Sequence, residues 1–509
     1  MLGIEAALAL TLLLLLMSLF SGYPVGVCLG GTGILAPLLI GGLSAIGVLD
    51  ASLMPDLARA LEQLALLSGN QLSSHLFAGS LADSLLAIPL FLLIGALLAN
   101  SGVMARLFAG LQALFAGVKP LNLPTVQLVL TGGLMAASSG VVAASVSTLA
   151  RVGMAPLIQA GVSQRQSAGL IMATGTLAQL IPPSISAILL AAMINTYYSV
   201  AHPGEVLTVN QLFLGAILPG AALLLAFVIY ASVQGLAAKS IPSNQPPSRL
   251  ALCSQLLDIA GPLVLILVVL GSIFGGLASP TVAAGLGVLV TLCLAAGRAG
   301  LAVVLGFAVA FTLLEISNLP PLIGWLALAA ALTALVVMSL AKAKRQALGQ
   351  SLVEAGIGWA NIALILVGAT IFNLGLKSFG ADLYLQELAS LTDQPWQLFL
   401  LLLLVFFVLG FVMEFVELVA LLIPLVGPIL FASDLDPVWV GVSLGLVVQT
   451  SFLTPPLGLA LFYFRSQVSM PTGALIGGVL PYVVIQLAVL ALVLAFPALT
   501  TWLPDLLLR

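Results

Sequence analysis

Charged side chains are scarce in this chain. Only 6% of its 509 residues are Asp, Glu, Lys or Arg, whereas 61% are hydrophobic. Soluble globular domains carry about 25% charged residues. The composition therefore predicts a multi-pass membrane protein surrounded by membrane lipid. The few basic residues form no patch, so we expect no nucleic-acid partner.

Residues for catalysis and metal binding are also few. The chain has two histidines, His75 and His202, and three cysteines without CxxC spacing, which argues against a metal cluster or a disulfide framework. A GxxxxGK[ST] phosphate loop and an HExxH motif are both missing from the sequence, so we expect no ATP hydrolysis and no metalloprotease chemistry. We therefore expect no enzyme activity and no organic cofactor. The run Gly30–Gly33 follows an apolar stretch and indicates helix packing.

Hydrophobic runs of about 20 residues, the length of a membrane-spanning helix, are what the chain has in abundance. They predict an all-α fold with about 12 transmembrane helices. The approximate bounds are 4–20, 24–48, 85–104, 167–195, 212–236, 258–278, 281–297, 301–318, 320–341, 356–376, 438–464 and 474–502. The more polar segment 50–84 predicts an amphipathic surface helix and a loop.

Basic residues set the orientation of these helices. The basic loops around 239–249, 298 and 342–345 fall on one side of the expected crossings, which we assign to the cytoplasm. Loop 196–211 is then periplasmic, and Lys377 is a periplasmic exception.

Two segments are too short to cross the membrane twice between their flanking charges. Only about 30 residues separate Lys119 from Arg151, whereas two crossings need about 40. Segment 121–150 therefore predicts a re-entrant hairpin, with the small residues 136–140 at its tip. The same count predicts a second hairpin over 396–430, entering from the periplasm.

A Pro-Pro pair interrupts two of the expected crossings, at Pro182-Pro183 and at Pro455-Pro456. Proline lacks an N–H and breaks a helix, and broken helices at membrane depth must face protein or a water-filled cavity. The two halves of the chain align at an offset of 273, which matches these pairs and the two hairpins. The charge argument makes the copies inverted, as in many secondary transporters. The alternative is that Gly and Pro recur by composition alone.

The broken helices supply candidate sites. A half-helix N-terminus suits an anion, and freed carbonyls suit a small cation. The candidate substrate-binding residues are Ser138, Ser139, Thr176, Ser184, Gln449, Thr450 and Ser451. The alternative is that these side chains only satisfy freed backbone groups. Glu414 and Glu417 are intramembrane carboxylates, which mark functional sites by default, or else cap the second hairpin.

These stretches resemble the large membrane subunit of TRAP transporters, the tripartite ATP-independent periplasmic systems. The likeness rests on residues 87–95, 175–184, 276–281 and 436–463. Within the family, the chain resembles the branch often labelled mannitol/chloroaromatic type. It implies a sodium-coupled symport permease with an elevator mechanism in the bacterial inner membrane. Implied partners are a small TRAP membrane subunit, a periplasmic substrate-binding protein and a small organic anion. The alternatives are a stand-alone ion-coupled carrier or antiporter, and an intramembrane enzyme or assembly scaffold.

The resemblance also implies sodium sites between each hairpin tip and the facing broken helix. Carried onto this sequence, the sodium ligands are Ser139, Gly140, Ala178, Ile181, Pro183, Glu414, Thr454 and Pro456. The chain departs from the family pattern at three places. Val141 and Val142 replace two serines, Ala178 replaces a glycine, and Val282 replaces an acidic residue. The first site therefore loses hydroxyls but keeps its backbone ligands.

The expected organisation has five parts. They are N-terminal scaffold helices with the amphipathic segment (1–84), a first transport half with hairpin 121–150 and broken helix 167–195 (85–195), scaffold helices including an added pair at 301–341 (196–355), a second transport half with hairpin 396–430 and broken helix 438–464 (356–464), and a C-terminal helix (465–509).

Overall fold

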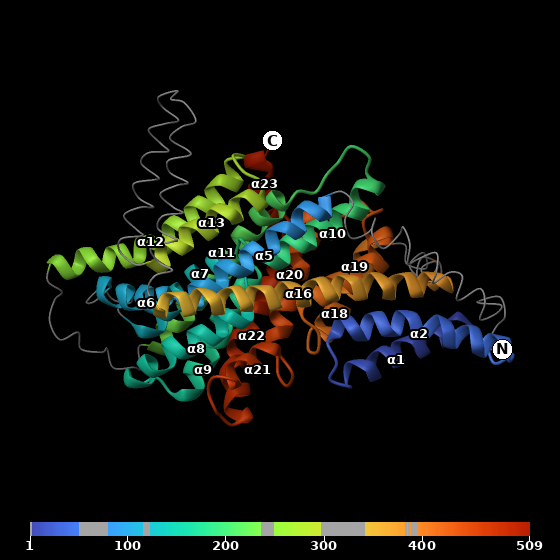
Figure 1. Cartoon of the computed structure of the whole chain (residues 1–509), viewed down its shortest axis with the longest axis horizontal. Coiled ribbons are helices and arrows are strands. Elements are labelled where there is room, and N and C mark those ends of the chain that lie inside the picture. The colour runs from blue at the N-terminus through green and yellow to red at the C-terminus, as the bar shows by residue number, and fades with distance from the viewer. Residues whose placement is uncertain are drawn as a thin grey trace. The chain divides into compact units, whose positions relative to one another are not determined.

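The computed structural model describes residues 3–49, 80–115, 123–235, 249–296, 342–381, 384, 387 and 394–508. Within these ranges the regular structure is entirely helical (Figure 1). The all-α prediction is therefore confirmed for this part of the chain. The added pair at 301–341 and most of the expected amphipathic segment, 50–79, lie outside the described residues, as do Lys119, Lys239 and Arg298.

The helices follow the expected hydrophobic runs closely. In chain order they are α1 (Ile4–Leu19), α2 (Val25–Ala45), α5 (Ser80–Asn100), α6 (Val103–Leu114), α7 (Pro124–Ser139), α8 (Val142–Gln159), α9 (Gln164–Thr176), the 3-10 turn η2 (Leu177–Gln179), α10 (Ile185–Ala201), α11 (Val209–Gly235), α12 (Arg249–Phe274), α13 (Pro280–Ala296), α16 (Lys342–Ser378), α18 (Pro395–Leu409), α19 (Phe415–Leu430), α20 (Pro437–Leu453), α21 (Leu459–Arg465), α22 (Thr472–Ala495) and α23 (Ala498–Leu508).

The described helices divide into two compact units. The first unit comprises Met1–Leu85, Ile188–Leu212 and Ile357–Leu444, and the second comprises Leu86–Ala187, Phe213–Gly356 and Gly445–Arg509. Each unit thus combines segments that are far apart in the sequence. The expected division into scaffold and transport halves stays a prediction.

Among the described helices, four are each long and apolar enough to cross a membrane alone. They are Val25–Ala45, Val209–Gly235, Arg345–Ser378 and Thr472–Ala495. The pair Leu85–Asn100 and Val103–Leu114, bent by 61°, counts as a fifth if it forms one span. The expected run 474–502 is instead two helices, because Pro497 lacks the N–H that would continue α22. The number of twelve crossings stays a prediction.

Helix starts recur at the offset of 273. Helix α8 begins at Val142 and α19 at Phe415, while α9 begins at Gln164 and α20 at Pro437. Helix–turn–helix pairs, α7–α8 and α18–α19, cover the two segments in which re-entrant hairpins are expected, and their re-entry into the membrane stays a prediction. The two copies therefore share their local structure as well as their sequence pattern, and their inverted orientation stays a prediction.

Glycines join α2 to α16 inside the first unit. A Cβ added to Gly368 would lie 2.0 Å from the carbonyl oxygen of Gly26, and one added to Gly375 would lie 2.2 Å from that of Gly33. The two glycines are seven residues apart on each helix, so the contact repeats after two helical turns. Small residues let membrane helices approach backbone to backbone. This contact confirms that Gly33, at the end of the glycine run, serves helix packing.

The second unit holds the first hairpin tightly against α9. A Cβ on Gly132 of α7 would lie 2.0 Å from Cγ2 of Thr174, and one on Gly175 would lie 2.4 Å from Cγ2 of Val146 on α8. The hydroxyl of Thr125 donates to the carbonyl of Ala231 on α11 at 2.8 Å. The hairpin is therefore fixed along its length, which positions its tip.

Candidate functional site

The first Pro-Pro pair interrupts a helix as predicted. Helix α9 ends at Thr176, and the chain passes through η2 and a turn before α10 begins at Ile185. In a continuous helix the carbonyls of Ala178 and Gln179 would accept from residues 182 and 183, but both of these are prolines. The break therefore removes the helical donors of two adjacent carbonyls.

Ser184 satisfies one of these freed carbonyls. Its hydroxyl donates to the carbonyl of Gln179 at 2.7 Å. The same oxygen accepts from the N–H of Ala187 at 3.4 Å, which is the geometry of a helix N-cap. Ser184 therefore satisfies backbone groups that the break leaves free, which was the alternative to a role in substrate binding. The carbonyl of Ala178, a predicted sodium ligand, gains no such donor from Ser184.

The tip of the first hairpin lies directly against this break. Gly140 ends α7 in the left-handed region with φ 60°, and a Cβ there would lie 2.7 Å from the carbonyl oxygen of Pro183 and 3.3 Å from the N atom of Ile185. Only glycine fits both the backbone angle and the contact. The structure therefore brings together Gly140, Pro183 and Ser184 of the predicted site. Ser139 ends α7 next to them, and its side chain lies outside the described part of the chain.

Two helix N-termini begin at this junction, which we call the tip–break junction (residues 138–142 and 178–187). Helix α8 starts at Val142 and α10 at Ile185. The N-cap of α8 is Val141, whose side chain makes no capping hydrogen bond. The first N–H groups of a helix lack internal partners and carry partial positive charge. The junction thus combines uncapped N–H groups, which suit an anion, with a freed carbonyl, which suits a cation.

Several hydroxyls of the predicted set return to their own helix. Ser138 donates to Met135 at 2.9 Å and Thr176 to Ala173 at 2.8 Å. At the C-terminal end of α20 the same pattern holds for Thr450, for Ser451 and for Thr454 directly after the helix, which donate to the carbonyls of Leu446, Val448 and Thr450 at 2.7, 2.8 and 2.7 Å. These hydroxyls keep acceptor capacity, but their protons are already used.

Buried polar atoms without hydrogen-bond partners concentrate in the second unit. Gln449 is fully buried, and neither its Oε1 nor its Nε2 has a partner among the described residues. The same holds for Nε2 of Gln179, Oγ1 of Thr174 and Oε1 of Gln486. Gln486 Nε2 donates to Thr176 Oγ1 at 3.1 Å, which ties α22 to the end of α9. Each orphaned group costs about 1–3 kcal/mol and calls for a ligand, ion or water.

The sequence patterns pointed to Gln449 but missed Gln179, Thr174 and Gln486. Gln179 and Thr174 lie within the predicted broken helix 167–195, yet no spacing rule separates them from their neighbours. Gln486 lies in α22, far from any break, where it is the only amide side chain. A lone amide in an apolar span was the available signal.

The second hairpin has a polar tip. Helix α18 ends at Leu409, and α19 begins at Phe415 after the N-cap Glu414. Glu414 and Glu417 form a reciprocal capping box, in which Glu417 Oε2 accepts from the N–H of Glu414 at 2.8 Å. In the structure both carboxylates therefore cap the N-terminus of α19, which was the alternative to a role in binding a cation. Glu414 belongs to the first unit and Thr454 and Pro456 to the second, so the second sodium site stays a prediction.

A known family matches almost the whole chain. The family described as "Tripartite ATP-independent periplasmic transporter, DctM component" matches residues 12–499. The C4-dicarboxylate TRAP transporter large permease protein DctM of Pseudomonas aeruginosa is 27% identical over 446 residues, covering 86% of this chain and 90% of the relative. The sialic acid TRAP transporter large permease protein SiaM of Vibrio cholerae is 26% identical, with coverage of 84% and 87%. The ectoine TRAP transporter large permease protein TeaC of Halomonas elongata is 26% identical, with coverage of 86% and 90%.

Two solved transporters share the fold. The YdaH transporter of Alcanivorax borkumensis aligns with a TM-score of 0.54 at 16% identity, covering 87% of this chain and 89% of that one. MtrF of Neisseria gonorrhoeae, described among antimetabolite efflux pumps, aligns with a TM-score of 0.53 at 15% identity, with coverage of 93% and 95%. At this identity the likeness concerns the fold alone. The curated relatives are transport permeases, not enzymes.

Proposed function

Because the chain belongs to the DctM component family of tripartite ATP-independent periplasmic transporters, we propose that it is the large transmembrane subunit of a sodium-coupled importer for a small organic acid anion. In this proposal a periplasmic binding protein delivers the anion, and a small TRAP membrane subunit completes the assembly. The two transport halves move inward together by an elevator mechanism in the bacterial inner membrane. Relatives named for C4-dicarboxylates, sialic acid and ectoine support this substrate class.

The anion is expected at the tip–break junction. The N-termini of α8 and α10 begin there, and Val141 leaves the first of them uncapped. Each N-terminus carries roughly half a positive charge, and a favourable, partly buried geometry contributes up to about 2 kcal/mol toward an anion. The replacement of family serines by Val141 and Val142 removes hydroxyls without removing these N–H groups.

Sodium is expected at the same junction. Hard cations bind oxygen ligands, and the break leaves the carbonyl of Ala178 without a helical donor. The predicted ligands Gly140 and Pro183 lie in contact across the junction, because the Cβ position of Gly140 is 2.7 Å from the oxygen of Pro183. Two further side-chain oxygens of the same unit, those of Gln449 and Gln486, are buried and unpaired among the described residues. This supply of unused oxygens is the support for sodium coupling.

The single observation that carries the proposal is the contact of Gly140 with the Pro183–Ile185 turn. The test is uptake into proteoliposomes that contain both membrane subunits, supplied with the cognate binding protein loaded with its own identified ligand. We expect uptake only with the binding protein and with an inward sodium gradient. Unchanged uptake after the sodium gradient is collapsed would contradict the coupling. Uptake without the binding protein would favour the stand-alone carrier.

A further inference from the structure

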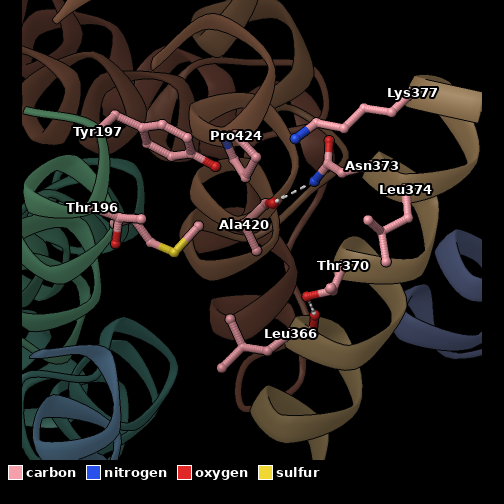
Figure 2. Close-up of a pocket in the computed structure, with 10 residues that line it drawn as sticks. Thr196, Tyr197, Leu366, Thr370, Asn373, Leu374, Lys377, Ala420 and Pro424 are labelled. Carbon is pink, nitrogen blue, oxygen red and sulfur yellow. Dashed lines mark hydrogen bonds between the residues drawn. The ribbon is translucent and has the colours of Figure 1, made fainter. Parts of the chain in front are cut away.

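A pocket of about 70 Å³ lies inside the first unit, among α10, α16 and α19. Its wall is mostly apolar, and its polar lining residues are Thr196, Tyr197, Thr370, Asn373 and Lys377 (Figure 2). None of these belongs to the tip–break junction. The volume admits roughly five water-sized groups, which is the size of a three-carbon acid.

Asn373 presents an unpaired acceptor in this pocket. Its side chain is 6% exposed, and Nδ2 donates to the carbonyl of Ala420 at 3.3 Å. That carbonyl needs an external donor because its helical partner would be Pro424, which has no N–H. This hydrogen bond fixes the orientation of the Asn373 amide, and its Oδ1 has no partner within the described ranges. A ligand that donates an O–H would satisfy it.

The equivalent residue of the other copy behaves differently. Asn100 aligns with Asn373 at the offset of 273. Its Nδ2 donates to Ser351 Oγ at 3.2 Å and to Glu354 Oε2 at 2.9 Å. The side chain of Asn100 therefore links two helices within the second unit, whereas that of Asn373 leaves an acceptor in a pocket.

Donors for an anion lie beside this acceptor. Lys377 follows Asn373 by one turn of α16, and no carboxylate lies within ion-pair distance of it in the described part of the chain. The ring of Tyr197 packs on Gly427, where an added Cβ would lie 2.8 Å from Cδ2. Figure 2 shows the Tyr197 hydroxyl and the Lys377 ammonium both directed toward the space beside Pro424. An ammonium and a phenol hydroxyl can together hold a carboxylate by charge-assisted hydrogen bonding.

We propose that this pocket is a second binding site, for a small 2-hydroxy acid. The carboxylate binds Lys377 and Tyr197, and the neighbouring hydroxyl donates to Oδ1 of Asn373. The carbonyl of Pro424 is a further acceptor for such a hydroxyl, because its helical partner would be Pro428. The site does not depend on the proposed transport function. Under the predicted orientation of Lys377 it would face the periplasm.

The test uses acylation of Lys377 by acetic anhydride on the full chain in nanodiscs, followed by mass spectrometry. Lactate at about ten times its Kd should slow this acylation roughly tenfold, and the other four lysines of the sequence should keep their rates. Propionate, which lacks the hydroxyl, should bind roughly tenfold more weakly because it leaves the acceptor unpaired. No protection by lactate, or equal binding of lactate and propionate, would overturn the proposal.

Variants separate the alternatives. Asn373→Leu should abolish the preference for lactate over propionate, and Tyr197→Phe should weaken both acids. Asn100→Leu is the matched control from the other copy and should change neither. Equal protection by inorganic phosphate, or by phosphatidylglycerol in the nanodisc, would replace the hydroxy acid by a phosphate group and contradict the proposal.

Discussion

Replacing Gly140 by alanine perturbs the tip–break junction at its point of closest approach. The residue has φ 60°, and the new Cβ would lie 2.7 Å from the carbonyl oxygen of Pro183. The left-handed backbone costs alanine about 1–2 kcal/mol. The contact adds about 1–3 kcal/mol, because neither backbone can yield without moving the tip or the break. Only this second part depends on the junction being closed.

We expect the clash in the Gly140→Ala variant to lower the apparent affinity for sodium more than it lowers the stability of the fold. If sodium binds between tip and break, the variant must overcome the clash each time the ion binds. A difference of about 1–3 kcal/mol corresponds to a 5–150-fold loss of apparent sodium affinity. The assay is the sodium concentration that gives half-maximal uptake into proteoliposomes, with the melting temperature of the purified chain measured alongside.

Gly276→Ala is the matched control. Gly276 also has a left-handed backbone, with φ 68°, but among the described residues, its two chain neighbours aside, no heavy atom lies within 4 Å of its Cβ position. It shares the backbone strain of Gly140 without the contact, so its sodium dependence should match the unmodified protein. If Gly140→Ala gave the same sodium dependence as Gly276→Ala, the assignment of sodium to this junction would be refuted.

Three further substitutions test other parts of the protein. Gln486→Leu removes an orphaned oxygen and the bond to Thr176, so we expect uptake to fall about tenfold or more while the melting temperature holds or rises; unchanged uptake would remove Gln486 from the site. Gly368→Val forces α16 away from Gly26 and should destabilise the chain by about 3 kcal/mol or more, measured by thermal unfolding in detergent; a melting temperature equal to that of the unmodified chain would contradict the packing. Glu414→Asn keeps an N-cap but removes the charge. If Glu414 only caps the hairpin, sodium dependence stays constant, whereas about a tenfold loss of sodium affinity would support the predicted second site.

The helix positions were predictable because membrane insertion leaves a strong local signal. Apolar runs, the two Pro-Pro pairs and the small residues around Gly140 each act on their own segment of chain. The length of α16 was not captured, because hydropathy ends near residue 356 while good helix formers continue back to Lys342. The end of α22 was missed because Pro497 lies inside an otherwise apolar run.

The candidate site was predictable only where it follows the chain. The family resemblance placed Gly140 and Pro183 in one site between a hairpin tip and a broken helix, and the structure has them in contact. The use of each hydroxyl was not predictable, because Ser184 and Thr450 bond to backbone whose geometry exists only after folding. Gln486 was missed for the same reason, since its contact with Thr176 spans 310 positions.

Hydrogen–deuterium exchange of the reconstituted assembly tests most directly whether sodium binds at the tip–break junction and holds the tip against the break. The backbone amides of residues 140–142 and 184–187 lie at the two sides of the junction. We expect sodium, and not potassium at equal ionic strength, to slow exchange in both segments together. Exchange that sodium leaves unchanged in both segments, in an assembly whose uptake is sodium-driven, would contradict it.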